Sequence, residues 1–364
     1  MLSFLPLAIL LPLTASDPVE VPLEASPDGT VKNSGWVSLD ASVSALASSL
    51  ESEDGNVSLW GFTKITYGVS KDLAVGTDSH YRAVAVDAAR IYFDGSDGTT
   101  ATRLSVDFAS GSASLFDAWA RFLLTEGANL HVGQFRTPFL RTAQIEANHN
   151  LFIFPTRNSL FYRVRDGSRQ GAMLSVEKEL LRWDMAVQNG FDQTVDNLLL
   201  SSRVEWDLLG EGPGDIEGAY GAPDEPQLTA GIAYSNAESG EEGVAMAAGV
   251  ALTMSRFYLQ IETVSYEAGY NTLDLDAGHI EDEDAGRGDT NPISVTCSHL
   301  IPGDLWEVGG RYERFDDVLG RELVTMGFNR YFQGHDTKLQ VNFSSENSSG
   351  DDVDIFGIGL TLSF

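Results

Sequence analysis

Guanidinium groups are the chemical functionality that this 364-residue chain concentrates most strongly. Twelve of its 23 basic residues lie between Arg82 and Arg182. A guanidinium presents several N–H donors in a fixed plane, so a wall that carries several of them attracts carboxylate or phosphate groups and repels cations. Each arginine can equally pair with an acidic neighbour such as Asp107 or Asp117 and hold a protein interior together. From the sequence both interpretations stay open.

A single long segment, residues 137–168, carries much of this charge. It contains four arginines and has two more at its ends. Arg103 and Arg121 belong to neighbouring stretches whose alternation directs them to a polar face, whereas the orientation of Arg90 is less certain. The candidate site residues are Arg103, Arg121, Arg136, Arg141, Arg157, Arg163, Arg165 and Arg169.

Other kinds of chemistry have weaker support. Residues 274–289 are rich in Asp and Glu but lack the spacing of an EF-hand loop, so we expect a solvated loop, with divalent-ion binding as the alternative. The six histidines are dispersed, and no nucleophile motif, Gly-rich phosphate loop or basic nucleic-acid patch is present in the sequence. We therefore predict no catalytic residue, cofactor, metal site or nucleic-acid partner.

The last nine residues indicate which kind of element positions these side chains. Phe356, Ile358, Leu360, Leu362 and Phe364 occupy every second position, with only Gly, Thr and Ser between them. In a strand, a period of two places this apolar set on one face. An apolar face towards lipid and a small, polar face towards a wet interior are typical of the closing strand of a transmembrane β-barrel. A strand of a soluble β-sandwich is the alternative.

Alternation of this kind recurs along the chain and predicts sixteen strands. Leu339 and Val341, for example, lie on either side of the polar Gln340. One irregularity is Arg90, which shares its parity with the apolar Val84 and so predicts a bulge or a misplaced strand edge. The predicted strands are 57–67, 82–93, 102–108, 115–123, 129–136, 169–177, 183–189, 198–206, 227–235, 244–253, 256–266, 292–299, 305–314, 322–332, 337–345 and 354–364.

The links between the predicted strands fall into two classes. Links after even-numbered strands are mostly short and turn-like, whereas those after odd-numbered strands include the long segments 137–168 and 267–291. Short periplasmic turns and longer external loops are typical of outer-membrane barrels. The link 207–226 is an exception on the short side, which indicates a hidden strand or an error in register. The expected fold class is all-β, a transmembrane antiparallel β-barrel of about 16 strands formed by residues 56–364.

The amino-terminal residues predict export. An apolar stretch, residues 4–13, precedes a small-residue cleavage site, so residues 1–16 are expected to be a signal peptide. Residues 17–55 are expected to form a short periplasmic segment, in which apolar residues of 36–50 have the spacing of a short helix that could pair with copies of itself. The alternatives are an unpaired amphipathic helix and a strand at the barrel entrance. The single cysteine excludes an intramolecular disulfide.

Residues 81–190 resemble a known family, the phosphate-selective porins O and P. The matching segments are 88–95 (AARIYFDG), 102–108 (TRLSVDF), 116–119 (FDAW), 132–139 (VGQFRTPF), 169–172 (RQGA) and 187–190 (VQNG). The resemblance implies a sixteen-stranded trimeric porin that conducts small anions by passive diffusion, and general porins fold their third external loop, here 137–168, into the channel. The terminal Phe364 resembles the sorting signal of outer-membrane barrels.

The charge of this chain differs from that of the family it resembles, whose phosphate-capturing members have lysine-rich external funnels. The sequence contains only five lysines and has a net charge of −30, which is consistent with a polar interior and acidic external loops. Acidic loops repel phosphate over a Debye length of roughly 8 to 10 Å. Phosphate selectivity, weak selectivity and cation preference therefore all stay open.

The sequence as a whole predicts an outer-membrane porin rather than an enzyme. Its expected partners are outer-membrane lipids, two further copies in a homotrimer, and small ions or hydrophilic solutes in transit. A non-conducting structural or adhesive barrel is the first alternative. A barrel lipase or protease and a soluble secreted sandwich are the others.

Overall fold

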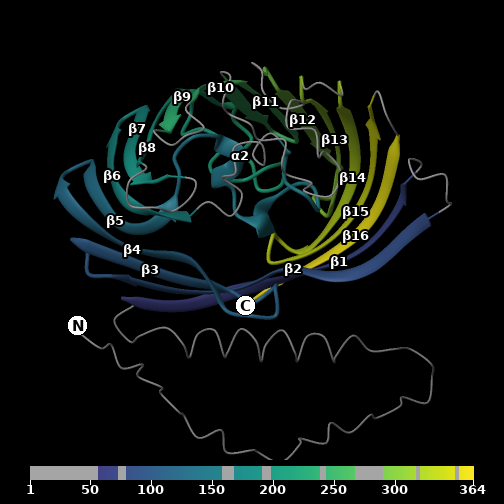
Figure 1. The fold of residues 1–364 in the computed structure, drawn as a ribbon, viewed down its shortest axis with the longest axis horizontal. Helices are drawn as coiled ribbons and strands as arrows, with labels where there is room; N and C mark the ends of the chain where they lie inside the picture. Colours follow the sequence, from purple (N-terminus) through teal and green to yellow (C-terminus); the bar gives the residue numbers. More distant parts are fainter. Residues whose placement is uncertain are drawn as a thin grey trace, which may run out of the picture. The chain divides into compact units, whose positions relative to one another are not determined.

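The computed structural model describes residues 56–72, 79–157, 168–190, 198–237, 243–266, 290–316, 320–348 and 352–364. Across these ranges, sixteen antiparallel strands close into one barrel, seen as a ring in Figure 1. Each strand pairs with its neighbours in the sequence, and the first pairs with the last. The predicted fold class is confirmed.

The strands are β1 (Val57–Asp72), β2 (Ser79–Ser96), β3 (Thr100–Asp107), β4 (Ser114–Thr125), β5 (Ala128–Arg136), β6 (Ser168–Lys178), β7 (Leu181–Asn189), β8 (Leu198–Leu209), β9 (Gln227–Ala237), β10 (Gly243–Met254), β11 (Phe257–Tyr266), β12 (Ile293–Leu300), β13 (Trp306–Arg314), β14 (Glu322–Gln333), β15 (Thr337–Asn347) and β16 (Val353–Ser363). Two short helices, α2 (Arg141–Gln144) and η1 (Ala147–His149), lie between β5 and β6. All sixteen predicted strands are present. The largest difference is at the end of β1, which the sequence predicts at residue 67.

The barrel closes between β1 and β16. The two strands are antiparallel, with Gly68 opposite Gly357. Beyond the last strand residue, the Phe364 N–H donates to the Gly61 carbonyl at 2.9 Å, and the Phe364 carbonyl accepts from the Gly61 N–H at 3.1 Å. A Cβ at Gly61 would lie 2.7 Å from the Phe364 ring. The glycine therefore leaves room for the terminal aromatic side chain at the seam.

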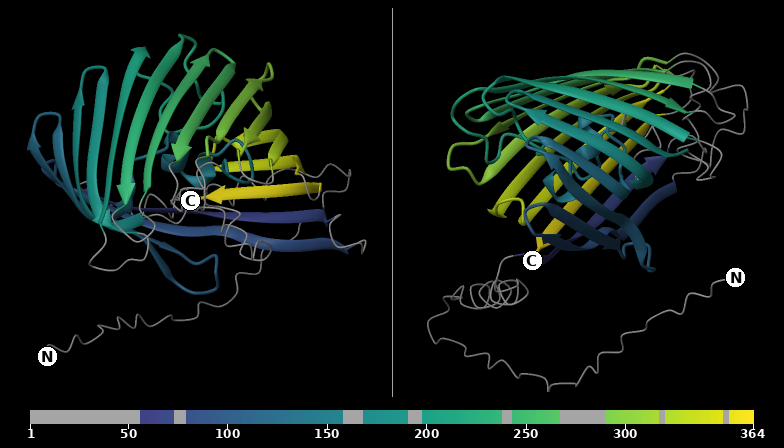
Figure 2. Two further views of the ribbon diagram at one scale, coloured as in Figure 1. Left: turned by 45° about the horizontal axis from the view of Figure 1, so that its top comes forward. Right: turned by 90° about the vertical axis from the view of Figure 1, so that its left-hand side faces the viewer.

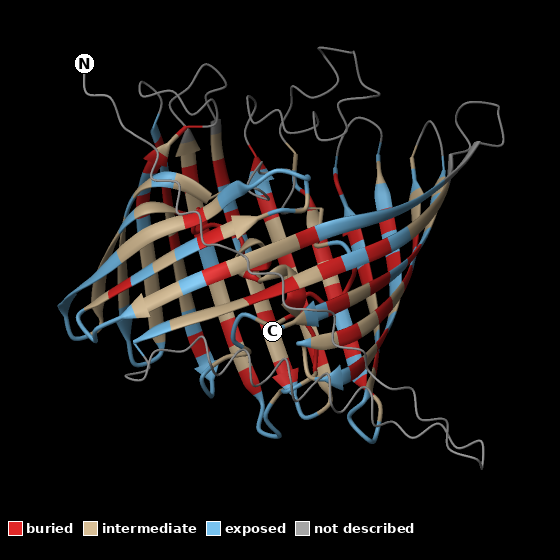
Figure 3. Ribbon diagram, turned by 90° about the horizontal axis from the view of Figure 1, so that it is seen from below, coloured by how far each residue is buried: buried red, intermediate tan, exposed pale blue. Residues whose placement is uncertain are grey.

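Alternation separates an apolar outer surface from a polar interior along the strands (Figure 3). In β15, Lys338, Gln340 and Asn342 are buried inside the barrel, whereas Phe343, the next residue, is 48% exposed on the outside. Because the barrel is closed, the backbone N–H and C=O groups of every strand pair with those of its neighbours. A structure that spans lipid needs this pairing, since the hydrocarbon region offers no water to bond these groups. The protein is therefore a membrane-spanning barrel. No helix in the described ranges is long and apolar enough to cross a membrane.

The irregularity predicted around Arg90 is a β-bulge in β2. The register of β2 against β1 shifts between Val86 and Ala88, which leaves Asp87 as the extra residue. Val84, before the bulge, is 72% exposed on the outside, whereas Arg90, after it, contacts interior residues. The bulge thus reverses the parity of the strand and turns Arg90 inward.

The connections follow the two predicted length classes, and the exception at β8–β9 is real. On one side the strands are joined by short links such as Glu126-Gly127 and Ser255-Arg256, and both barrel ends also lie on this side. After β8 ends at Leu209, residues 210–226 contain no strand, so the link conceals neither an extra strand nor a register error.

Candidate functional site: the barrel interior

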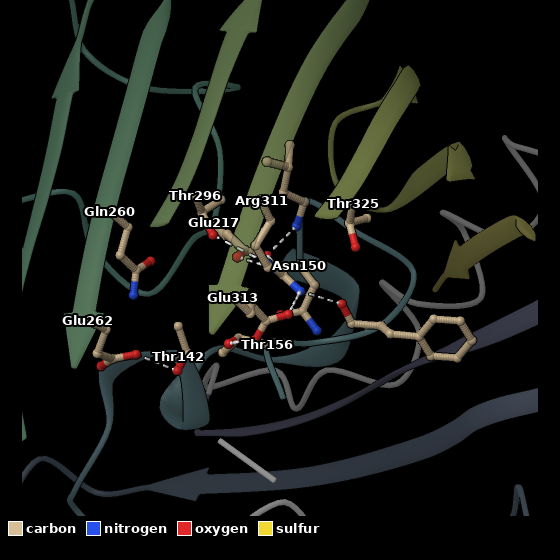
Figure 4. Close-up of polar contacts among 12 residues, drawn as sticks. Thr142, Asn150, Thr156, Glu217, Gln260, Glu262, Thr296, Arg311, Glu313 and Thr325 are labelled. Atoms are coloured by element: carbon tan, nitrogen blue, oxygen red, sulfur yellow. Dashed lines mark hydrogen bonds and ion pairs between the residues drawn. The ribbon is translucent and has the colours of Figure 1, made fainter. Parts of the chain in front are cut away.

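The β5–β6 loop enters the barrel and first contacts its inner wall at β11. Phe139 and Leu140 pack into an apolar cluster with inward-facing residues of β8 to β11 and β14. The Glu262 carboxylate of β11 then accepts a hydrogen bond from the Arg141 N–H at 2.7 Å. It accepts a second from the Thr142 hydroxyl at 2.6 Å (Figure 4). These contacts hold the first residues of the loop against the inner wall.

Farther along, polar side chains of the wall hold the loop by its backbone carbonyls. Lys338 donates to the Asn150 carbonyl at 2.6 Å, and Gln340 donates to the carbonyls of Asn150 and Leu151. Asn329 also donates to the Leu151 carbonyl, at 2.7 Å. Buried donors from β14 and β15 thus replace the solvent that the loop backbone would otherwise need.

Glycines on the same wall admit the apolar side chains of the loop. A Cβ at Gly327 would lie 2.8 Å from the Phe152 ring, and a Cβ at Gly359 would lie 3.0 Å from Ile153. The sequence predicted that the small-residue face of the last strand meets a wet interior. That expectation is wrong at Gly357 and Gly359, because Ile153 covers them. Loop side chains, rather than water, fill this side of the interior.

A second segment enters the barrel from the opposite, short-turn side. Within residues 210–226, Glu217 is buried and accepts two hydrogen bonds from Arg311 of β13, at 2.8 and 3.1 Å. Its carboxylate also accepts the Leu151 N–H at 2.9 Å. Figure 4 shows Glu217 directed towards Arg311. The two inserted segments therefore meet inside the barrel.

Arg90 and Arg136 share one partly buried carboxylate at the wall formed by β2 to β5. Glu146 of the loop lies 2.7 Å from Arg136 and 3.4 Å from Arg90, and Arg90 also pairs with Asp107 at 2.8 Å. Burial alone raises the pKa of Glu146, but the charges of Arg136 and Arg90 outweigh burial and hold this pKa below its usual value. Both guanidiniums also lie over the ring of Phe116.

Arg103 and Arg121 lie nearer the short-turn end of the same wall. Arg103 forms a bidentate pair with Asp94 at 2.7 and 2.9 Å, and both side chains retain about a quarter of their exposure, 28% and 26%. Trp60 donates to the same carboxylate at 2.8 Å. Arg121 is exposed and shares its parity with the inward-facing Trp119. Within the described ranges it has no ion-pair partner.

The remaining candidate arginines have varied surroundings. Arg141 is buried and donates to the carbonyls of Gly214 and Ile216, so it braces the second inserted segment. Arg157 pairs with Glu346 of β15. Arg169 donates to the Gly190 carbonyl at 2.7 Å. Arg163 and Arg165 lie outside the described residues, as do the acidic stretch 274–289 and the amino-terminal residues 1–55.

Sequence reasoning did not single out a further charged cluster on β7 and β8. Arg182 lies 3.1 Å from Asp207 and 3.7 Å from Glu205, and Glu205 also pairs with Arg203. The signal was available, because Arg203, Glu205 and Asp207 alternate with Val204 and Trp206. Glu146 and Glu217, in contrast, belong to irregular segments and carry no periodic signal.

Charged side chains on the two sides of the barrel differ in their access to solvent. Arg311, Glu217 and Glu313 retain only 1 to 3% of their side-chain exposure. On the opposite wall, Arg103 and Asp94 retain 28% and 26%, and Arg182 retains 31%. The more accessible charged side chains of the interior therefore lie on β2, β3 and β7.

Two of the described histidines pack against each other and against aromatic rings. His149 and His335 lie edge to face, with ring centroids 5.2 Å apart, and Tyr220 and Tyr331 also contact His335. Burial, followed by the charge of Lys338 and the proximity of His149, lowers the pKa of His335 to about 2. Among the described residues, no three His, Cys, Asp or Glu side chains are placed to hold a metal ion.

No protein-family model and no curated protein matches this chain by sequence. Solved structures do match by fold. The anion-selective porin from Comamonas acidovorans superposes with a TM-score of 0.62 at 13% identity, over 85% of this chain and 99% of that one. The outer membrane channel DcaP of Acinetobacter baumannii gives 0.57 at 12% identity, over 86% and 99%. OmpT of Vibrio cholerae, in a trimer form, gives 0.55 at 12%, over 85% and 99%.

At these identities the similarity establishes the fold: a sixteen-stranded barrel of the kind found in outer-membrane porins. The exposed apolar side chains on the outer surface match that architecture. The chain is accordingly an outer-membrane β-barrel.

Proposed function

We propose that this protein is an outer-membrane porin through which small hydrophilic solutes or ions diffuse passively. The observation that carries the proposal is the difference in exposure between the two sides of the interior. Charged groups on β11 to β15 are sealed by the inserted segments, whereas Arg103, Asp94 and Arg182 stay accessible to solvent. A partly filled barrel with a polar, hydrated wall is the arrangement that a selective aqueous pore needs.

The proposed solute path follows the wall of β2 to β8. Arg103 and Arg121 would face the solute directly, whereas Glu146 and Asp107 neutralise most of the charge of Arg90 and Arg136. Arg157 lies within the loop and Arg169 just after its end, and Arg163 and Arg165 fall between them in the sequence. Arg141 is better explained as a brace for residues 210–226.

Anion preference is the selectivity that this wall favours. Most of its arginines are matched by carboxylates, but Arg121 is exposed and has no acidic partner among the described residues. The Comamonas porin of similar fold is named anion-selective, and residues 81–190 resemble phosphate-selective porins. Small inorganic anions, including phosphate, are therefore the proposed preferred solutes.

A homotrimer is the proposed assembly. The support is the fold shared with OmpT of Vibrio cholerae, whose structure includes a trimer form. Light scattering on the detergent-solubilised protein, corrected for bound detergent, should give the mass of three chains. The mass of one chain would contradict this part of the proposal.

Residues 1–16 are proposed to be a signal peptide, and residues 17–55 a periplasmic segment. Intact-mass measurement of protein purified from outer membranes should show a chain that begins close to Asp17. A chain that still begins at Met1 would contradict the proposed cleavage.

The central experiment is a planar lipid bilayer with a salt gradient and protein folded in detergent. Discrete current steps are expected, with a reversal potential whose sign indicates anion preference. A heat-denatured aliquot of the same preparation should give no steps. If the folded barrel gives none either, the porin proposal fails.

The second candidate function is a non-conducting structural or adhesive barrel. It is favoured by one observation, namely that segments from both ends of the barrel meet in its interior. The same bilayer experiment separates the two candidates, because a structural barrel produces no current steps.

A further inference from the structure

The β8–β9 segment, residues 210–226, occupies an unusual position for a link on the short-turn side. The link after β4 is Glu126-Gly127 and that after β14 is Gly334-His335-Asp336, yet this one continues from β8 into the interior. Two independent attachments hold it there.

The first attachment is the carboxylate of Glu217. Arg311 donates two hydrogen bonds to it, and the side chains of both residues retain only 2 to 3% of their exposure. Arg311 in turn donates to the Phe154 carbonyl of the β5–β6 loop at 3.0 Å. The wall, the loop and the segment are thus joined through a single guanidinium.

The second attachment is formed by the residues that follow Glu217. The Ala219 N–H donates to the Glu307 carboxylate of β13 at 2.6 Å. Tyr220 stacks on Tyr331 of β14, with ring centroids 4.0 Å apart. Between the two attachments, Gly218 has a φ of +121°, and a Cβ there would lie 2.9 Å from the Glu307 carboxylate. Glycine is therefore the residue that permits this close approach.

The segment is also bound directly to the β5–β6 loop. The Glu217 N–H donates to the His149 carbonyl at 3.2 Å, and the Leu151 N–H donates to the Glu217 carboxylate at 2.9 Å. Arg141 of the loop donates to the Gly214 carbonyl. Because the polar groups of both segments satisfy one another, the pair is a built part of the interior rather than a loosely placed turn.

We propose that residues 210–226 form an inner plug that, together with the β5–β6 loop, sets the bore of the channel and the size of solute that passes. Glu217 acts as a positioning residue that holds the plug on Arg311, and the solute contacts neither group. The inference rests on the proposed porin function and adds the element that determines size selectivity. Without the plug, the side of the interior next to β12 to β14 would be open from the short-turn end.

The test replaces residues 211–225 with Asn-Gly, which provides a tight turn like those at the other short links. Wild type and variant are compared by single-channel conductance and by swelling of liposomes in neutral sugars of increasing size. The variant is expected to have a higher conductance and to admit larger sugars. Folding is checked by the heat-dependent shift in gel mobility that barrels show.

Point variants test the role of Glu217 separately. Glu217→Gln keeps the shape and an acceptor for Leu151 but removes the charge that Arg311 faces. It is expected to increase current noise and the size of admitted sugars, whereas Glu225→Gln, on the exposed part of the same segment, should change neither. The double variant Glu217→Arg with Arg311→Glu restores an ion pair of reversed polarity. It should recover part of the wild-type size limit that Glu217→Gln loses. If the loss came from a general structural defect, a second substitution would not recover it.

The outcomes of the plug replacement are distinguishable. Equal conductance and equal sugar passage in a folded variant would overturn the plug while leaving the porin function intact. Current from the variant but not from wild type would support a plug that seals the barrel and would favour the non-conducting candidate. Silence from both would reject the porin function and the plug together.

Discussion

Arg121 has different surroundings from the other arginines described on the β2–β8 wall. Arg90, Arg103 and Arg136 each face a carboxylate at 2.7 to 2.8 Å, whereas Arg121 is exposed and has no such partner within the described ranges. A paired guanidinium adds little net charge to the path of an ion, and an unpaired one adds nearly a full charge. We therefore expect substitution of Arg121 alone to change the preference of the channel for anions over cations.

Arg121→Glu should shift the reversal potential towards cation preference. A unit charge about 4 Å from an ion changes its energy by about 1 kcal/mol in water-like surroundings, with opposite sign for anions and cations. Each permeability should therefore change by up to about fivefold per charge, and the anion-to-cation ratio should fall by up to about 30-fold per charge. The measurement is the reversal potential in a potassium chloride gradient. Arg256→Glu is a matched control, because Arg256 lies in a turn and pairs with the exposed Asp304. An unchanged ratio in Arg121→Glu would remove Arg121 from the solute path.

Glu146 makes the stability of the loop dependent on pH. Its pKa in the folded protein lies below the ordinary value near 4.5 because Arg136 and Arg90 favour the ionised form. A depressed pKa means that the stabilisation is fully present above pH 4.5 and is lost as the pH falls through the folded-state pKa. Thermal unfolding of the wild type, followed by circular dichroism, should therefore shift to lower temperature in acid.

Glu146→Gln should lower stability at neutral pH by about 3 kcal/mol, since it leaves two largely buried guanidiniums with one counter-charge fewer. Its stability should also vary less with pH below 4.5 than that of the wild type. Glu225→Gln, at an exposed site, is the control and should follow the wild-type curve. A Glu146→Gln curve parallel to wild type would show that another acid causes the pH dependence.

At the scale of elements, the fit between the β5–β6 loop and the glycines of β13, β14 and β16 decides where the loop lies. Phe152 and Ile153 project onto strand positions that have no side chain. Figure 2 shows how the long, tilted strands surround the segments inside. Because the loop packs closely against the wall, a single methyl group added between them should lower the stability of the protein.

Gly327→Ala should destabilise the barrel by about 1 to 3 kcal/mol through overpacking, because a Cβ there would meet the buried Phe152 ring at 2.8 Å. Gly310→Ala is the matched control, since a Cβ there has nothing within 4 Å. The thermal unfolding midpoints of the two variants provide the comparison. Equal midpoints would mean that Phe152 moves aside without cost.

At the scale of the whole molecule, Phe364 extends the β1–β16 pairing that closes the barrel. The Phe364 backbone pairs with Gly61 in both directions, and its ring covers the same glycine. On the outside, Trp306 stacks on Phe328, and Arg330 lies over Trp306, as expected for an aromatic girdle at a membrane interface. Closure and anchoring thus both use aromatic side chains.

Phe364→Ala should weaken the β1–β16 seam by about 1 kcal/mol, because part of the buried ring area is lost. The expected result is a lower temperature for the heat-dependent gel shift and less folded protein in the outer-membrane fraction. Phe332→Ala, which removes an exposed aromatic away from the seam, is the control. A larger loss in the control than in Phe364→Ala would contradict the role assigned to the terminal residue.

The sequence by itself determined the strands and their alternation, and it marked an irregularity around Arg90 that is a β-bulge in the structure. These features depend on a period of two, which is a local property of any chain that faces lipid on one side and polar groups on the other. It also identified Arg103 and Arg121 as inward-facing and 137–168 as a long connection. It did not reveal Glu146 or Glu217, because irregular segments carry no period.

Only the tertiary structure decided how the interior is filled. The contact of Lys338 with the Asn150 carbonyl joins residues 188 positions apart, and that of Arg311 with Glu217 joins residues 94 apart. Such pairs exist only because closure of the barrel brings distant strands around the same interior. For the same reason the glycines of β16 appeared to face water in the sequence, and are in fact covered by Ile153 from a loop that no local pattern could place there.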